Sequence, residues 1–215
     1  MLKFLYTLFK LFLLLTLPFI FLIRGSVFLH THYELAAWPA ILGGMLATAL
    51  LLVIYFSFLY GRIYGKLGES GSLKRRLIIA LLVVGGYSLY GLLYLSNQNV
   101  KHDKISSTYT QLHPILRLSI STILYADRSL IITDAARQPE DYRKMGLPSK
   151  GRSLHYQQKN GYVHAIDVRT KGRSELRNRL LKLYFRLMGL NTLHHVGTDD
   201  HLHISLMSHD SPGAI

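Results

Sequence analysis

Long apolar runs fill the first part of the chain and then stop. Residues 1–96 contain three such runs with few charges, at about 4–23, 35–60 and 77–95. A helix needs roughly 20 apolar residues to cross the hydrocarbon core of a bilayer, so each run predicts a transmembrane helix. Beyond residue 96, polar and apolar positions alternate as they do in a soluble domain. The pattern therefore predicts a three-helix membrane anchor followed by a separate domain.

The first run differs from a secretory signal peptide in two respects. Its apolar core is too long, and no small-x-small cleavage site follows closely. Lys10 falls inside the run, but its long side chain can reach the headgroup region. We therefore expect this run to be retained as an anchor.

Basic residues are unevenly distributed between the loops that join these runs. The loop after the first run, Arg24 to Glu34, has one Arg and one Glu, whereas the next loop has a single acidic residue, Glu69. Its basic residues are Arg62, Lys66, Lys74, Arg75 and Arg76. Because short loops rich in Lys and Arg stay in the cytoplasm, this distribution places the C-terminal domain outside, in a periplasm or an extracellular space.

Small residues occur at close-packing spacing in the second and third runs: Gly43 and Ala47 in one, and Gly85, Gly86 and Gly91 in the other. We expect these two helices to pack on each other. Neither run has an Asp, Glu, Lys, Arg or His in its core, which favours an anchor over a transporter. Contact between these helices and another membrane protein stays open.

Periodicity beyond the anchor predicts an α+β domain over 111–208, with a polar tether at 97–110 and a loose tail at 209–215. Helical spacing covers 112–125, 138–145 and 174–188. Strand-like patterns cover 129–133, 152–157, 162–169, 192–196 and 201–207. Lys159-Asn160-Gly161 predicts a hairpin turn. Folding there places His155 and Asp167 opposite each other, or one residue off register, on neighbouring strands.

The helix expected over 174–188 is amphipathic, with Ser174 as its N-cap and Gly189 as its C-cap. We expect its apolar stripe to be buried: Leu176, Leu180, Leu183 and Leu187. Its other face is basic: Arg177, Arg179, Lys182 and Arg186. We interpret this basic row as a solvated face, with contact to anionic lipid or glycan as the alternative.

Composition narrows the class of partner. The chain has no cysteine, so an exported domain has to be held together by its core, or by its core and a metal, without disulfides. The net charge of +13 is shared about equally between residues 1–96 and 97–215. A basic outward-facing domain suits an anionic partner such as cell-wall polymer or lipid headgroups, and this location disfavours nucleic acid.

Side chains of the metal-ligand type gather in the last third of the chain. They lie in Ser153-Leu-His155, Ala165-Ile-Asp167 and Asp200-His201-Leu-His203. Alternation puts His201 and His203 on one face of the last strand. A catalytic zinc uses three such ligands and leaves a fourth position for water, so the pattern predicts a metal site.

Together with Ile131-Ile-Thr-Asp-Ala-Ala-Arg137, these motifs resemble in their order the zinc D-Ala-D-Ala peptidase group. That group shares its fold with hedgehog signalling domains and is related to lysostaphin-type endopeptidases. The resemblance covers about 112–207 and implies a hedgehog/DD-peptidase-like α+β domain with a central antiparallel sheet. The implied roles are zinc ligands for His155, Asp167 and His203, general base for Asp200 or His201, and binding of a substrate carboxylate or oxyanion for Arg137. The interval between His155 and Asp167 is longer than is common in the family, and Asp200 replaces its usual Glu.

The resemblance implies a zinc metallopeptidase anchored in a bacterial inner membrane. Its substrate would be a peptidoglycan stem peptide, cut as by a D-Ala-D-Ala carboxypeptidase or a related endopeptidase. The alternative is a non-catalytic, metal-stabilised binding or regulatory module of the same fold. A third possibility is a domain that only docks on another subunit.

We interpret the remaining histidines as structural. Strand alternation points His164 to the face opposite Asp167. His113 precedes Pro114 at a helix start. His194 and His195 are expected at the surface or behind a metal ligand.

Overall fold

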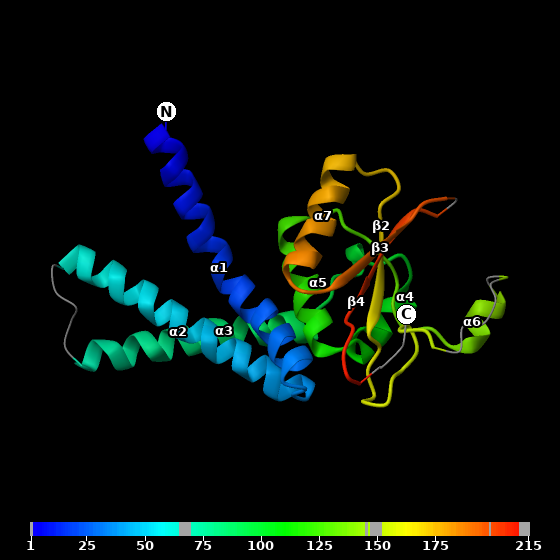
Figure 1. The fold of residues 1–215 in the computed structure, drawn as a ribbon, viewed down its shortest axis with the longest axis horizontal. Coiled ribbons are helices and arrows are strands. Elements are labelled where there is room, and N and C mark those ends of the chain that lie inside the picture. Colours follow the sequence, from blue (N-terminus) through cyan, green and yellow to red (C-terminus); the bar gives the residue numbers. More distant parts are fainter. Residues whose placement is uncertain (1, 65–69, 145, 147–151, 198, 211–215) are drawn as a thin grey trace.

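The computed structural model describes residues 2–64, 70–144, 146, 152–197 and 199–210. Three long helices extend from one side of an α+β domain (Figure 1). They are α1 (Leu2–His32), α2 (Ala37–Tyr64) and α3 (Ser70–Leu93). The segments Lys3–His32, Ala37–Leu59 and Ser72–Leu93 are long and apolar enough to cross a membrane. The prediction of three helices of membrane-spanning length is confirmed.

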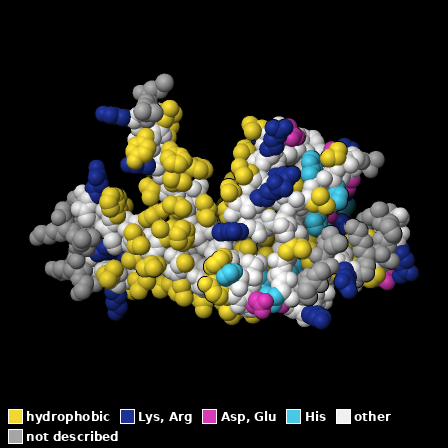
Figure 2. Space-filling model, viewed as in Figure 1, with side chains coloured by type: hydrophobic (Ala, Val, Ile, Leu, Met, Phe, Trp, Pro, Cys, Tyr) yellow, Lys and Arg dark blue, Asp and Glu magenta, His cyan; other side chains and the backbone are white. Residues whose placement is uncertain are grey.

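The outer surfaces of these helices are covered with exposed apolar side chains (Figure 2). Leu15 on α1, Phe58 on α2 and Leu82 on α3 are examples. An apolar surface of this extent is unfavourable in water, whereas lipid tails solvate it. The surface of the three helices therefore fits association with a bilayer.

Helix α1 is longer than its apolar run predicted. It continues through Arg24 to His32, because Val27 and its neighbours pack on the domain and on α2. A short connection then leads to α2, with Glu34 in the left-handed region (φ 54°). The outward loop expected between the first two helices is thus mostly helix.

Helices α2 and α3 pack on each other as expected, but the glycines of α2 face α1 instead. A Cβ on Gly44 would lie 2.5 Å from the Leu22 carbonyl oxygen of α1, so no larger residue fits there. Gly85 and Gly86 of α3 have nothing among the described residues within 4 Å of a built Cβ. The expectation that these glycines join the second and third helices is wrong. Apolar side chains make that contact: Val53 with Ala49 on α2, and Ala80 with Val84 on α3.

The segment expected to be a loop-like tether is folded. It forms the 3-10 helices η1 (Asn97–Asn99) and η2 (Tyr109–Gln111) on either side of α4 (Asp103–Thr108). Tyr109 is buried, and its hydroxyl lies 3.1 Å from the backbone oxygens of both Gly91 and Arg117. The polar composition of the segment concealed two buried apolar residues, Ile105 and Tyr109, which fix it to the core.

Four short strands form one antiparallel sheet in the order β1-β2-β4-β3. They are β1 (Ile132–Asp134), β2 (Ala165–Arg169), β3 (Asn191–His195) and β4 (His201–Ser205). The α+β class with a central antiparallel sheet is confirmed. Ile166, Leu202 and Ile204 point to the core, where α5 (Pro114–Ala126) and α7 (Glu175–Leu187) lie (Figure 1). Asp167 and His203 therefore occupy the opposite face.

One predicted strand is absent from the described structure. Residues 152–157 turn back on themselves, since the Tyr156 N–H donates to the Ser153 carbonyl (3.1 Å). Their only ladder contact is an isolated bridge between Gln157 and Val163. The hairpin turn itself is confirmed, because the Gly161 N–H donates to the Gln158 carbonyl (2.9 Å).

Helix α7 buries the face that was not expected to be buried. Leu181, Phe185 and Met188 are in the core. The predicted stripe is exposed: Leu176 68%, Leu180 55%, Leu183 51% and Leu187 57%. The helix has apolar residues on two opposite faces, and the domain uses the one that includes the large Phe185 ring. The Ser174 N-cap is confirmed by its hydrogen bond from the Arg177 N–H.

The anchor and the domain share one hydrophobic core. Ile23 of α1, Ile41 of α2 and Leu92 of α3 belong to the same buried cluster as Leu118 and Ile120 of α5. Helix α5 thus lies between the three long helices and the sheet, and the two parts of the chain pack as a single unit. The remaining short helix, α6 (Pro139–Lys144), lies on the far side of the sheet from the anchor (Figure 1).

Candidate metal centre

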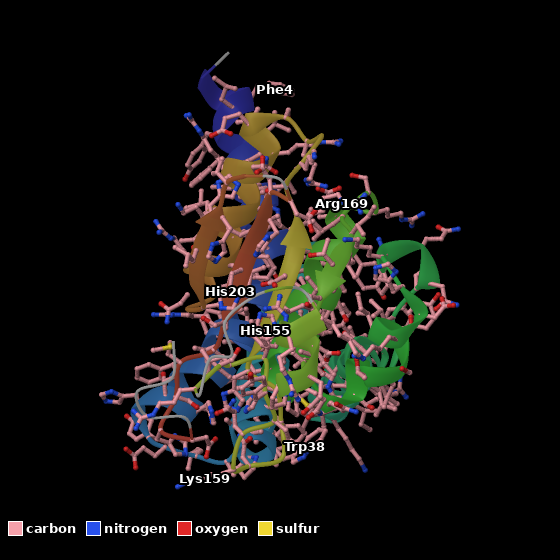
Figure 3. The ribbon with its side chains drawn as sticks, turned by 90° about the vertical axis from the view of Figure 1, so that its right-hand side faces the viewer. Phe4, Trp38, His155, Lys159, Arg169 and His203 are labelled. Atoms are coloured by element: carbon pink, nitrogen blue, oxygen red, sulfur yellow. The ribbon has the colours of Figure 1, made fainter. Side chains whose placement is uncertain are left out.

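Three predicted ligands converge on the open face of the sheet, where His155 and His203 lie side by side (Figure 3). The β2–β4 register pairs Asp167 directly with His203. His155 reaches the same point from the turn before β2. His203 Nδ1 is 2.8 Å from Asp167 Oδ1, His155 Nε2 is 3.3 Å from the same oxygen, and the two nitrogens are 3.2 Å apart.

This triangle has the dimensions of a zinc site. Ligand atoms about 2.0–2.2 Å from a tetrahedral zinc lie about 3.3 Å from one another. The donor atoms of His155, Asp167 and His203 are at 2.8 to 3.3 Å. Two imidazoles and a carboxylate are ligands that zinc accepts, and three ligands leave the fourth position free. The residues present therefore fit a catalytic type of zinc site.

The backbone holds His155 in the tautomer that a metal requires. Its Nδ1 lies 2.6 Å from the Ala135 carbonyl oxygen, which can only accept, so Nδ1 carries the proton and Nε2 keeps its lone pair. Ser153 supports this position, since its Oγ accepts the His155 backbone N–H (3.3 Å) and contacts the Tyr142 hydroxyl (2.7 Å). The Ser-x-His pattern therefore has a local structural reason.

Arg137 lies behind Asp167. Its Nη2 donates to Asp167 Oδ2 (2.7 Å), its Nε to Asp134 Oδ2 (2.6 Å), and its Nη1 to the Tyr142 hydroxyl (3.2 Å). Burial alone would lower the pKa of Arg137, but the two carboxylates raise it above its usual value. Three of the five N–H donors of Arg137 thus have partners among the described residues, and the guanidinium fixes Asp167 with Oδ1 toward the histidines.

Asp167 is buried and ionised. Burial alone would raise the pKa of its carboxyl, but the adjacent His155 and His203 hold that pKa well below its usual range. A buried carboxylate surrounded by imidazoles and a guanidinium is a compensated charge. The same negative charge would attract a cation to this position.

The two candidate bases differ in their placement. His201 Nε2 lies 3.8 Å from Asp167 Oδ2, while its Nδ1 donates to the Asp199 carbonyl (2.8 Å), which leaves an Nε2 lone pair on the open face. The His195 ring stacks on His201 with centroids 4.8 Å apart. Asp200 instead accepts the Gly197 N–H within the β3–β4 turn. The structure therefore brings His201 to the metal ligands and directs the Asp200 carboxylate into its own turn.

A cavity of about 720 Å³ opens over these residues. The candidate metal ligands form one wall, with Arg137 and His201 beside them, and Leu190, Leu193 and Met207 supply the apolar part of the lining. A space of this size accepts a short peptide segment or a similar small molecule. Asp200 is not among the residues that line it.

The sequence motifs identified the three candidate ligands, Arg137 and His201, which the structure brings together, but missed the residues that support them. Asp134 and Tyr142 were not singled out, and both bind Arg137. The Asp at the end of an apolar strand, three residues before Arg137, was the available signal for Asp134. His195 was expected only as a surface or supporting residue, and it lines the cavity.

Comparisons of the chain with family models, curated proteins and solved structures found no match.

Proposed function

We propose that this protein is a membrane-anchored zinc metallopeptidase of the bacterial cell envelope that acts on peptidoglycan stem peptides. The observation that carries the proposal is the triangle of donor atoms from His155, Asp167 and His203, which matches one face of a zinc tetrahedron and opens on a cavity. The order of the motifs, which resembles that of zinc D-Ala-D-Ala peptidases, supports the same reaction class and a hedgehog-type arrangement of the domain.

The roles of the surrounding residues follow from their contacts. When bound, zinc supplies Lewis acidity that lowers the pKa of a water to about 7. His201 Nε2, with its lone pair free, takes the proton from the attacking water and returns it to the leaving amine. Arg137 holds Asp167 in place and keeps two N–H donors for the terminal carboxylate of a peptide or the developing oxyanion.

The location of the reaction follows from the charge of the loops. The adjoining ends of α2 and α3 and their connection are basic, with Arg62, Lys66, Lys74, Arg75 and Arg76 against Glu69, so this end of the helices belongs on the cytoplasmic side and the domain on the outer side of an inner membrane. Cell-wall peptides are found on that side. The net positive charge of the domain suits an anionic wall polymer.

One observation favours the alternative, a metal-stabilised binding module without catalysis. The resemblance places a carboxylate base at Asp200, and here that carboxylate accepts a backbone N–H in its own turn. If His201 does not serve as base, the site would bind zinc and peptide without cleaving the peptide.

Zinc analysis and muropeptide digestion of the full-length protein in detergent distinguish these functions. We expect one zinc to depend on His203 and Asp167, and we expect mass spectrometry to detect loss of a terminal D-amino acid or a split stem peptide. His203→Ala should abolish cleavage, whereas exposed His102→Ala should not. A wild type that holds zinc at this site but leaves every muropeptide intact would support the binding module. A folded wild type without zinc at this site would rule out both functions.

A further inference from the structure

A second group of histidines lies where the anchor meets the domain. This histidine cluster consists of His30 near the end of α1, His113 at the start of α5, His164 just before β2, and His209 with Asp210 after β4. It shares no residue with the site formed by His155, Asp167 and His203. Asp210 belongs to two triads, one with His30 and His209 and one with His113 and His164, and within each triad the donor atoms lie within 4.8 Å of one another.

The cluster is buried and tightly assembled. His30, His113 and His164 are each 0% exposed. The His113 ring centroid lies 4.8 Å from those of both His30 and His164, and the His30 and His209 centroids are 5.0 Å apart. Four imidazoles and a carboxylate at this spacing are a donor set for a divalent transition metal.

Several nitrogen atoms of the cluster have no hydrogen-bond partner among the described residues. They are His30 Nε2, His113 Nε2 and His209 Nδ1. A buried polar atom without a partner costs about 1–3 kcal/mol, so core histidines normally have both nitrogens satisfied. His30 Nε2 lies 3.6 Å from Asp210 Oδ2, which is too long for a hydrogen bond but close to the spacing of two ligands on one cation.

Backbone carbonyls orient two of the rings for metal binding. His30 Nδ1 donates to the Leu35 carbonyl (2.7 Å), and His164 Nδ1 donates to the Leu206 carbonyl (3.3 Å). Both rings therefore keep the lone pair on Nε2, as His155 does through Ala135.

One amide group holds two of these groups together. Asn160 Nδ2 lies 2.9 Å from both His164 Nε2 and Asp210 Oδ2 and donates to both, so the imidazole lone pair and the carboxylate face the same point. A cation that bound both acceptors would displace this amide group.

We propose that the histidine cluster is a second metal site, which binds zinc through His30, His209 and Asp210 and completes its coordination from His164. Because the ligands come from α1, from the start of β2 and from the residues after β4, bound zinc would join the membrane helices to the domain. Its closed, buried environment is that of a structural site, in contrast to the open site beneath the cavity.

Metal analysis of the full-length protein in detergent tests this proposal separately from the peptidase function. The first site is removed by His155→Ala with His203→Ala, and this variant is freed of metal and then titrated with zinc. We expect one zinc per chain to remain. Adding Asp210→Asn should lower the zinc affinity of the second site more than about 100-fold. Substituting a residue that only hydrogen-bonds to a metal ligand already lowers metal affinity by about 10- to 100-fold. Exposed His32→Ala on α1 is the matched control and should leave the affinity unchanged.

Cobalt provides a second readout that does not depend on a folded His30 variant. Co²⁺ bound by the variant that lacks the first site should give the visible absorption bands of tetrahedral coordination, and Asp210→Asn and His209→Ala should change them. Asp210 and His209 lie at the edge of the cluster, partly exposed, so these substitutions leave the core intact. A variant lacking the first site that binds no zinc, or a folded Asp210→Asn protein with unaltered zinc affinity, would overturn the proposal.

The exposed stripe on α7 carries an independent inference. Leu176, Leu180, Leu183 and Leu187 form an apolar face in full contact with solvent. Arg177 borders the stripe on one side, and Arg179 and Arg186 border it on the other. In Figure 1, α7 runs crosswise to α2 and α3 beside the domain ends of the long helices, and Figure 2 shows its apolar edge turned toward them with basic side chains alongside. The stripe therefore continues the lipid-facing surface of the anchor.

We infer that α7 lies in the surface of the membrane, with its leucines in the acyl boundary and its arginines at anionic phospholipid headgroups. A helix with one apolar face and basic flanks has the composition of an interfacial helix. The buried Phe185 face attaches it to the domain, and the exposed face would attach it to the bilayer.

Site-directed fluorescence can measure this contact, because the chain has no native cysteine to label. The full-length protein is reconstituted in nanodiscs of anionic lipid that carries a bromine-labelled acyl chain, with a fluorophore on Leu180→Cys or Leu183→Cys. We expect strong quenching at both positions and weak quenching at Arg143→Cys on α6, which is exposed on the far side of the domain. Quenching at Leu180→Cys no greater than at Arg143→Cys would overturn the inference.

Discussion

Asp167 lies directly opposite His203 in the β2–β4 ladder, with Asp167 Oδ1 2.8 Å from His203 Nδ1. The contact depends on strand register, since a slip of one residue would turn one of the two side chains to the core face. Core residues on both sides, Ile166 with Ile204 and Val168 with Leu202, set that register. The hydrophobic pattern of two strands therefore determines the geometry of a polar site.

The guanidinium behind Asp167 should control metal affinity without being a ligand. Arg137→Gln removes the donor to Asp167 Oδ2 and leaves a buried carboxylate less well oriented. We expect the zinc affinity of this site to fall by about 10- to 100-fold, measured by competition with a chromogenic chelator. Arg143→Gln, which breaks the exposed Arg143–Glu140 pair, is the matched control and should have no effect.

If the proposed reaction is correct, substitutions of the two candidate bases, His201 and Asp200, should differ in their effect on kcat. His201→Ala should lower kcat for muropeptide cleavage by about 10²- to 10⁴-fold, the usual contribution of a general base, while zinc stays bound. Asp200→Asn keeps an oxygen that accepts the Gly197 N–H and should lower kcat far less. The opposite order would assign the base to Asp200.

The ion pair between Asp127 and Arg173 should make stability depend on pH. Burial alone would raise the pKa of Asp127, but its hydrogen bonds from Arg173 and Ser129 hold that pKa below the value of 3.8. The folded pKa is thus below the unfolded one, so the stabilisation is complete above about pH 4 and is lost as pH falls through the folded pKa. Asp127→Asn should cost about 1 kcal/mol at pH 7, seen as a lower Tm in detergent, and nothing at a pH below the folded pKa.

Glu140→Gln is the matched control for that experiment, because Glu140 pairs with Arg143 at an exposed position. Exposed pairs contribute little, so its Tm should follow that of the wild type at every pH. If the Tm of Asp127→Asn stayed below that of the wild type by the same amount down to the lowest pH, the ion pair would not be the cause of the difference.

Gly189 should report on the contact between α1 and α7. Its φ is +87°, and a Cβ there would lie 1.9 Å from Arg24 Nη1 and 3.0 Å from Val27 Cγ1. Gly172 has a similar φ of +78° with nothing described within 4 Å, so Gly172→Ala adds only backbone strain of about 1 kcal/mol. We expect Gly189→Ala to lower the Tm in detergent more than Gly172→Ala does. Equal effects would mean that the Arg24 and Val27 side chains move aside without cost.

Local patterns predicted most elements of the domain but not how they pair. Alternation was sufficient for β2 and β4, and it put Asp167 and His203 on strands with the correct faces. His155 was expected on a strand paired with β2, whereas it lies in a turn, and the neighbours of β2 are β1 and β4. Strand partners are chosen by long-range packing, which the spacing of residues along the chain does not encode.

Helix α7 shows a different limit. Its position and its Ser174 cap were predicted, but the buried face was assigned to the wrong apolar stripe. The sequence does not distinguish which of the two apolar stripes is buried. The buried stripe is selected by the volume that α5 and the sheet leave for Phe185. Hydrophobicity also does not distinguish a side chain that faces a protein core from one that faces lipid.

The histidine cluster was invisible to motif reasoning for a similar reason. His30, His113 and His164 each have an ordinary local explanation, as a helix end, a helix start and a strand entry. They meet only because α5 packs between the long helices and the sheet. A ligand set drawn from separate elements has no characteristic spacing.

The core that Ile41 and Leu92 share with α5 limits how far the domain can move relative to the three long helices. A domain on a flexible stalk can sweep a volume, whereas this one is built onto its three long apolar helices and keeps one height and one tilt relative to them. Under the proposed function, a wall peptide would have to come down to the membrane surface to enter the cavity. The proposed enzyme would then select material near the bilayer by position, before any side chain recognises it.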